Sequence, residues 1–218
     1  MLTISEVVFD LLHYSPYIDE LLDKRVVNTS ALARLLKPQV EEKIGKKIHT
    51  GALLMAIRRY SPKKSRRSVH VLFKDPPEMI VRSNLCEYTV SNSHLSAQDY
   101  KTLSELVGEK QKYFVTVTQG VYETTIIASK ELDLRIKKIL APAKVVSHID
   151  KLSSITIRLP DNAAEMSGVY YAILKPLAWE GINVVEVVAT FLEFTLILHD
   201  RDVDKSFSLL KKFFSQFG

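Results

Sequence analysis

The order strand, helix, strand, strand, helix is predicted twice in this chain, over residues 78–140 and again over residues 155–214. Corresponding elements are separated by a nearly constant number of residues. The second strand of each set is expected to begin at Tyr113 and at Val184, an offset of 71 residues, and the third strands have the same offset. A constant offset across several elements indicates a duplicated module. The chain is therefore expected to contain two small α+β modules.

Apolar residues in the second copy recur with the periods of strands and helices. Ile155, Ile157 and Leu159 alternate with polar residues, which indicates a half-buried strand. One face of a helix is marked by residues three or four positions apart, namely Val203, Phe207, Leu210, Phe214 and Phe217. We expect Asp202 to cap this helix, and Pro176 to bend the preceding one because proline lacks a backbone donor.

The first third of the chain is predicted to be helical. Asn28 begins a cluster of capping residues that precedes an apolar helical segment. We expect Pro38 to interrupt that helix, and Gly45 to end the segment that follows it. Thr50 is the predicted cap of a last helix over residues 51–60. A strand is then predicted over residues 69–73, and we place a domain boundary near residue 67.

The positive charge of the chain is concentrated in this helical part. Residues 1–67 hold 13 Lys and Arg against 7 Asp and Glu, a net charge of +6, whereas the whole chain carries +5. Such asymmetry suggests a polyanion-binding module joined to a neutral one. In a winged helix-turn-helix the late helix enters the major groove and the basic loop after it contacts phosphates. The predicted nucleic-acid-binding residues are Thr50, Arg58, Arg59, Lys63, Lys64, Arg66 and Arg67.

A second interpretation of the basic region stays open. Residues 52–57 of the last helix are mainly apolar, so few polar side chains remain for contacting base edges. A small helical domain with a solvated basic linker would show the same charge, since a basic surface is only one criterion for nucleic-acid binding.

No sequence pattern indicates reaction chemistry. The six histidines are scattered, and no two have the spacing of metal ligands. Gly45 and Lys46 lack the earlier glycine that a phosphate-binding loop requires. Cys86 lies in a predicted strand without an evident base, and no nucleophile-elbow motif occurs. We therefore expect no enzyme activity, no catalytic residue, no metal and no cofactor.

The expected location is the cytoplasm. Cys86 is the only cysteine, so no internal disulfide can form, and this fits a reducing compartment. No run of about 18 apolar residues exists, so we expect no membrane contact. The N-terminal sequence has no basic region followed by an apolar core, so a secretory signal is not expected.

The second copy resembles an ACT domain, and its pattern is most similar to the regulatory ACT domains of aspartate kinases. The resemblance rests on residues 155–161, Gly168 with Val169, residues 179–184 and residues 202–205. In that family a loop after the first strand leads into a helix with a glycine near its start, and a Gly-Ile-Asn turn opens the second strand. Two residues differ from the family pattern: Ser167 replaces the usual proline, and Pro176 lies within the helix.

The resemblance implies two ferredoxin-like βαββαβ modules after a helical, winged-helix-like domain. The second copy ends after its second helix, so one strand is missing, and its sheet would keep an open edge. We expect the strand at residues 69–73 to complete it, which places the first module inside the second. The predicted domains are residues 1–67, a first module at 78–149, and a second module formed by 68–75 and 150–218. The resemblance also implies a homodimer formed through side-by-side ACT modules.

The resemblance further implies an amino-acid site in the second copy. Backbone N–H groups at a helix N-terminus attract a carboxylate, and Gly168 would allow close approach to the backbone. Asp161 or Asn162 would contact the amino group, and Asn183 would hold the loop from the next strand. The predicted residues are Asp161, Asn162, Ala163, Gly168, Val169 and Asn183. The alternative is that these are ordinary turn residues.

Taken together, these features are similar to those of predicted regulators of amino-acid metabolism. The expected function is an amino-acid-responsive regulator whose helical domain binds duplex DNA. Two alternatives are a free-standing regulatory subunit that docks on an amino-acid biosynthetic enzyme, and an ACT dimerisation scaffold without a ligand. The Lys-Phe-Gly-Gly start of the aspartate kinase catalytic domain has no counterpart in the sequence.

Overall fold

The computed structural model of the protein describes residues 2–60, 73, 75–108, 113–141 and 143–215. The chain divides into two compact units, a helical unit (Met1–Arg66) and a sheet unit (Arg67–Gly218). Each unit has a hydrophobic core of its own. Within the described residues, no helix combines the length and the apolar composition that crossing a membrane requires.

Four helices form the described part of the helical unit. They are α1 (Ile4–His13), α2 (Pro16–Asp23), α3 (Thr29–Ile44) and α4 (Thr50–Arg59). Asn28 caps α3, because its Oδ1 atom accepts the backbone N–H groups of Ser30 and Ala31 at 3.1 and 3.0 Å. The core is formed where α1, α3 and α4 meet, and it buries Leu12, Val40 and Leu53.

Two predictions for these helices were wrong, and one was confirmed. Pro38 does not interrupt α3, since the helix buries Leu36 and Val40 on either side of it and this packing compensates for the lost backbone bond. Thr50 is the first residue of α4, whose N-cap is His49, without a side-chain cap. Gly45 ends α3 in the left-handed conformation (φ 75°), as predicted.

The described part of the sheet unit contains one six-stranded antiparallel sheet with the order β2-β3-β1-β4-β6-β5. The strands are β1 (Met79–Ser91), β2 (Val115–Gln119), β3 (Glu123–Ser129), β4 (Val145–Arg158), β5 (Val184–Ala189) and β6 (Glu193–His199). The helices are α6 (Ala97–Gly108), α7 (Asp133–Leu140), α8 (Val169–Trp179) and α9 (Asp200–Phe214). The predicted repeat of strand, helix, strand, strand, helix is confirmed. Asp202 lies in the first turn of α9, and the N-cap is His199, so that prediction was wrong by three residues.

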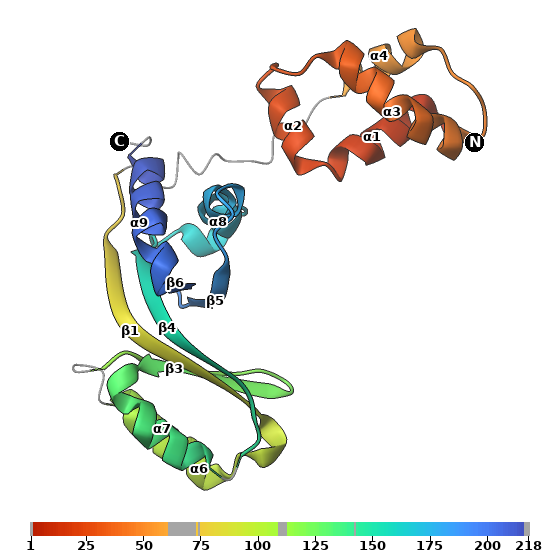
Figure 1. Ribbon diagram of the computed structural model, residues 1–218. Coiled ribbons are helices and arrows are strands. Elements are labelled where there is room, and N and C mark those ends of the chain that lie inside the picture. The colour runs from red at the N-terminus through yellow and green to blue at the C-terminus, as the bar shows by residue number, and fades with distance from the viewer. Residues whose placement is uncertain (1, 61–72, 74, 109–112, 142, 216–218) are drawn as a thin grey trace. The chain divides into compact units, whose positions relative to one another are not determined.

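The two longest strands are shared between the modules (Figure 1). From Leu85 onward, β1 pairs with β3 on one side and with β4 on the other. Its first residues, Met79–Arg82, pair only with the second half of β4, which in turn pairs with β6. Each module therefore has four strands in the order expected for βαββαβ, and each takes one strand from a segment that continues into the other.

The strand that completes the second module was predicted wrongly. Met79–Arg82 occupies the place beside β4 that we expected residues 69–73 to take. Most of that predicted strand lies outside the described residues. Phe73 is described: its side chain is buried in the second module, and its ring packs on Phe214 with centroids 4.8 Å apart.

Each shared strand passes from one module into the other at a residue with left-handed backbone conformation. These residues are Asn84 (φ 59°) in β1 and Lys151 (φ 58°) in β4, and the register between the strands shifts beside both. Such bulges insert one extra residue and reverse the alternation of side chains along a strand. Leu85 and Leu152, directly after the two bulges, are paired with each other.

The four α-helices in the described part of the sheet unit pack on one face of the sheet. Strand residues such as Tyr88 and Ile155 contact helices α6 and α7 or α8 and α9. A separate cluster of strand residues lies on the opposite face, formed by Leu85, Ile127, Leu152 and Ile197. Since neighbouring residues of a strand point to opposite faces, this cluster defines the open face of the sheet.

Equivalent threonine pairs occur on the open face of both modules. Thr89 and Thr125 place their hydroxyl oxygens 3.2 Å apart in the first module. Thr156 and Thr195 do the same in the second, at 2.9 Å. These pairs are related by offsets of 67 and 70 residues, so the duplication extends to single contacts between strands.

Candidate functional site

The predicted amino-acid-binding residues lie around α8 of the second module. Asp161 and Asn162 are exposed in the loop between β4 and α8. Ala163 and Val169 are buried in the module's core, 6% and 3% exposed, so only their backbone groups are available to a ligand. Gly168 is exposed and adopts φ 87° immediately before the helix, a conformation that glycine adopts without strain.

The N-terminus of α8 has no side-chain cap. Gly168 is its N-cap residue and accepts the backbone N–H of Ala172 through its own carbonyl, but it has no side chain to accept the first-turn N–H groups. Unsatisfied N–H groups and the helix dipole make such an end attractive to an anion. The carboxylate of Asp161 and the amide of Asn162 lie in the same loop, seven and six residues before Gly168.

Asn183 lies away from this loop. It is exposed in the turn after α8, where the N–H of Ile182 donates to the carbonyl of Leu177 at 3.0 Å. The loop precedes α8 and the turn follows it, and a helix of 11 residues is about 16 Å long. Within one chain, Asn183 therefore does not hold the loop as we expected.

The loop instead contacts the turn between β5 and β6, which sequence reasoning missed. The N–H of Leu159 donates to the carbonyl of Leu192 at 2.8 Å. Phe191, in the same turn, is 66% exposed. The family plan offers the signal that would have found it, because the loop after the first strand and the turn between the two following strands lie at one end of the sheet.

The equivalent loop of the first module is held by its own polar side chains. The Nδ2 group of Asn92 donates to the carbonyl of Gly120 at 2.8 Å, and its Oδ1 atom accepts the hydroxyl of Thr124 at 2.6 Å. Its backbone N–H donates to the carbonyl of Tyr122 at 2.9 Å. These bonds tie the loop to the turn between β2 and β3, and they engage both polar atoms of the Asn92 side chain.

The N-terminus of α6 is capped as well. The backbone N–H of Ser96 donates to Asp99 at 2.8 Å, and the N–H of Asp99 donates to the Ser96 hydroxyl at 3.2 Å, a reciprocal capping box. Hydrogen bonds from Ser96 lower the pKa of Asp99. Of the two equivalent helix ends, only the one in the second module is therefore open to an external anion.

The predicted nucleic-acid-binding residues are only partly described. Thr50, Arg58 and Arg59 are exposed on α4, whose other side buries Leu53 and Ile57 in the helical unit. Lys63, Lys64, Arg66 and Arg67 lie outside the described residues. Two lysines that the prediction did not include, at positions 46 and 47, are exposed in the turn before α4.

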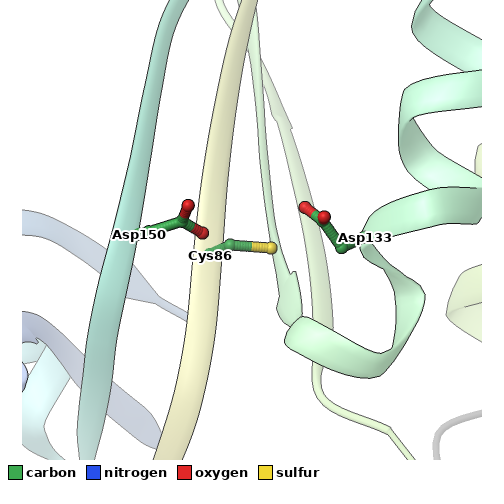
Figure 2. Close-up of side chains that lie close together, drawn as sticks. All are labelled: Cys86, Asp133 and Asp150. Atoms are coloured by element: carbon green, nitrogen blue, oxygen red, sulfur yellow. The ribbon is translucent and has the colours of Figure 1, made fainter.

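The first module also contains a polar cluster that the sequence did not reveal. Cys86 of β1, Asp133 of α7 and Asp150 of β4 place one potential metal-ligand atom each within 4.8 Å of one another (Figure 2). The ammonium group of Lys130 binds both carboxylates, with 3.3 Å to Asp133 and a hydrogen bond to Asp150. The Tyr88 hydroxyl donates to Asp133.

These partners make the cluster a closed network rather than a metal site. Burial would raise the pKa of Asp133, but hydrogen bonds from Lys137, Tyr88 and Lys130 outweigh it and hold the pKa well below its usual range. Burial, with Asp133 nearby, raises the pKa of the Cys86 thiol to about 11. A metal ion would have to displace Lys130 and remove a proton from a thiol that holds it strongly.

Several solved structures are similar to this chain. The aspartokinase alpha and beta subunits align with a TM-score of 0.51 and 14% identity, over 63% of this chain and 97% of that one. The regulatory subunit of aspartate kinase from Thermus flavus aligns with a TM-score of 0.51 and 12% identity, over 62% and 96%. Aspartate kinase from Clostridium acetobutylicum aligns with a TM-score of 0.50 and 13% identity, over 62% and 34%. No protein-family model and no curated protein sequence matches the chain.

These comparisons show the fold of the sheet unit. The helical unit is less than a third of the chain, so an alignment over 63% must lie mainly in the sheet unit. The sheet unit therefore has the α+β fold of the ACT-type regulatory domains of aspartate kinases.

Proposed function

We propose that the sheet unit is an amino-acid-responsive regulatory domain whose ligand binds at the loop before α8. The observation that supports this most is the uncapped N-terminus of α8, because the equivalent end of α6 is closed by Ser96 and Asp99. The ligand's carboxylate would accept N–H groups of the first turn of α8, and its amino group would meet Asp161. The similarity of the fold to aspartate kinase regulatory subunits supports the same proposal.

A thermal-shift screen of the twenty amino acids tests the ligand. A ligand at one hundred times its Kd stabilises the folded state by about 2.7 kcal/mol, and a melting-temperature rise is expected for at least one amino acid. Asp161→Ala should abolish that rise, whereas Ser93→Ala, in the exposed equivalent loop, should leave it unchanged. A screen in which no amino acid raises the melting temperature would leave only the scaffold interpretation.

Asn183→Ala tests whether a second chain completes the site. Because α8 separates Asn183 from the loop within one chain, a loss of ligand affinity in this variant would require Asn183 to come from a partner subunit in the proposed homodimer. An unchanged affinity would restrict the site to the loop and the α8 N-terminus.

For the helical unit we propose duplex DNA binding through the exposed side of α4 and the turn before it. Arg58 and Arg59 in its last turn, and the lysines before its first turn, supply the cations. Affinity should fall steeply with added salt, since neutralised phosphates release counterions. The Arg58→Ala, Arg59→Ala double variant should weaken binding to all sequences alike, and Glu42→Ala, an exposed change on α3, should not weaken it.

The rival function is a regulatory subunit that docks on an amino-acid biosynthetic enzyme. It gains support if the chain shows no affinity for duplex DNA at low salt while an amino acid still raises its melting temperature. In both cases we assign no reaction to this chain, and its effect would be exerted on the molecule that it binds.

A further inference from the structure

The first residues of β1 form a free edge of the sheet in the second module. Met79–Arg82 pair with β4 on one side, whereas β3 pairs with β1 only from Leu85 onward, so the described residues provide no strand on the other side. A free edge exposes unpaired backbone groups, and proteins commonly protect it with lysine, proline or a bulge. No lysine or proline lies within Met79–Arg82, and Ile80 and Val81 are 48% and 43% exposed. This edge is therefore suited to pairing with another strand.

The backbone groups that face this edge belong to Met79 and Val81. The N–H of Arg158 in β4 donates to the carbonyl of Glu78 at 3.0 Å, so the backbone groups of Glu78 point toward β4. This direction alternates from one residue to the next in an antiparallel pair, so the N–H and C=O groups of Met79 and Val81 point away from β4. An identical antiparallel strand can satisfy them if Met79 of each strand pairs with Val81 of the other.

The charges along the edge are self-complementary in that register. Ile80 faces the partner's Ile80 at the twofold axis, and Glu78 faces the partner's Arg82. Because the axis repeats this contact, the dimer contains two such ion pairs. Opposite charges that face each other across antiparallel strands stabilise the pairing, and like charges destabilise it. Arg82 forms no ion pair with any of the described residues, so its charge is available to a second chain.

A second copy would also extend a row of alternating charges on the open face. Glu78, Arg158 and Glu193 lie side by side on neighbouring strands, since Arg158 pairs with Glu193 and binds the backbone of Glu78. The guanidinium of Arg158 lies 3.9 Å from the carboxylate of Glu78. The three residues, together with Ile80, help to line a hollow of about 400 Å³ beside the edge. The partner's Arg82 would add a positive charge next to Glu78, so the signs alternate along the whole row.

The other free edges of the described sheet lack this complementarity. β2 has no charged residue, and Glu186 is the only one in β5. The first half of β4 is the free edge of the first module, and its only acid, Asp150, is already bound by Lys130. Among these edges, residues 78–82 therefore fit a second copy of themselves best.

We propose that residues 78–82 form a homodimer interface, in which the β1 strands of two chains pair antiparallel about Ile80 and join the two sheets into one. A twofold interface requires a surface that is complementary to itself, and this edge meets that requirement in its hydrogen-bonding groups and in its charges. The interface involves few residues, so the dimer should be weak and concentration-dependent. It does not depend on the amino-acid site proposed at the loop before α8.

Charge exchange between two variants provides the direct test. Glu78→Arg places arginines opposite each other at both ion pairs, and Arg82→Glu places glutamates there, so each variant alone should dimerise roughly 10- to 100-fold more weakly than the wild type. An equimolar mixture of the two should dimerise about as well as the wild type, because every facing pair then has opposite charges. Sedimentation of the full chain over a range of concentrations measures this. Glu193→Arg also places a positive charge beside Arg158, but on the side away from the edge, and should leave the dimer unchanged.

A cross-linking experiment tests the register. In a non-hydrogen-bonded antiparallel pair the two Cα atoms are about 4.5 Å apart, so Ile80→Cys should form a disulfide between two chains under mild oxidation. Val81→Cys, at a site of similar exposure, faces the partner's Met79 and should not be cross-linked. The natural Cys86 is buried, so it does not interfere.

Three results would overturn the proposal. One is a chain that stays monomeric at every concentration, and an amino-acid response in such a monomer would leave the site before α8 in place. A second is a dimer that Glu78→Arg does not weaken, because its interface would lie elsewhere. The third is a mixture of the two charge variants that dimerises no better than either variant alone.

Discussion

The two modules of the sheet unit share a fold but differ in how their polar groups are satisfied. The first module closes its loop with Asn92, its helix end with Ser96 and Asp99, and its sheet–helix contact with the Asp133 network. The second module has an uncapped helix end at Gly168. At the position of Tyr88 it has Ile155, 67 residues later, buried in an apolar core. The comparison teaches that the two modules keep one frame, while the first caps its helix end with its own side chains and the second leaves the equivalent end without a side-chain cap.

The largest expected effect concerns the Asp133 network. Asp133→Asn should destabilise the protein by about 3 kcal/mol at pH 7, because charged hydrogen bonds from Lys130, Lys137 and Tyr88 are weakened. Urea unfolding measures this loss. Asp204→Asn, an exposed change in the second turn of α9, should stay within about 0.5 kcal/mol. Equal effects would contradict the view that the Asp133 network stabilises the first module.

The Asp133 network also predicts how the stability of the protein changes at low pH. Because the folded-state pKa of Asp133 is lowered, its contribution to stability is fully present above the ordinary carboxyl pKa and is lost as the pH falls toward the folded value. Unfolding free energies measured from pH 5 down to pH 2 should fall less steeply in Asp133→Asn than in the wild type. A parallel decline in both proteins would mean that other carboxylates account for acid sensitivity.

Ionisation of Glu87 has the opposite effect on stability, because it lowers the stability of the folded state as the pH rises. Its folded-state pKa of about 7 exceeds the ordinary value, so its stabilising neutral form is lost as the pH rises from about 4.5 through 7. Without ligand, Glu87→Gln should therefore be more stable than the wild type at pH 8, by about 2 kcal/mol. The two proteins should converge near pH 5, and a variant that is less stable at pH 8 would show that Glu87 already has a partner.

Variants in the equivalent loops of the two modules should differ less in stability. Asn92→Ala leaves the buried hydroxyl of Thr124 with one acceptor fewer and should cost about 1.5 kcal/mol. Asn162→Ala changes an exposed residue in the loop before α8 and should cost less than about 0.5 kcal/mol. Thermal unfolding without ligand measures both, and similar losses would show that the second loop is also fixed by its own side chains.

Variants at the N-termini of α6 and α8 should show the smallest difference in stability. Ser96→Ala removes the capping box of α6 and should cost about 1 kcal/mol. Ser167→Ala, directly before Gly168, should be close to neutral, because α8 has no side-chain cap to lose. Urea midpoints of the two variants test this, and a clear loss in Ser167→Ala would mean that the α8 end is already satisfied.

The sequence predicted those features of the fold that depend on residues close together in the chain. The pattern of apolar residues placed the start of β5 at Val184, as the structure has it. The same pattern could not show that β1 and β4 each serve two modules, because that depends on pairing between residues such as Met79 and Ile157, far apart in the chain. Asn84 and Lys151 lack the usual signal for a left-handed residue, which is glycine.

The candidate site was predicted in part. The exposed position of Asp161, and of Gly168 before the helix, follows from turn chemistry and was expected. Ala163 and Val169 were chosen from the family pattern, although small and apolar residues beside a helix start commonly fill the core, as they do here. The Asp133 network and the burial of Glu87 were not foreseen, since each depends on residues from separate elements that only the folded sheet brings together.

The shared strands also determine how the sheet unit can fold and be divided. The four strands of the first module lie within residues 85–150, and those of the second lie before and after this segment, but β1 and β4 run through both modules. Leu85 and Ile127 of the first module also pack with Leu152 and Ile197 of the second in one cluster. The two modules should therefore unfold in one cooperative transition rather than one after the other. Pairing of β1 with the distant end of β4 gives the unit a high contact order, and such topologies fold slowly. A ligand that stabilises one module then raises the unfolding free energy of the whole sheet unit, which is a physical route by which binding in the second module is felt in the first.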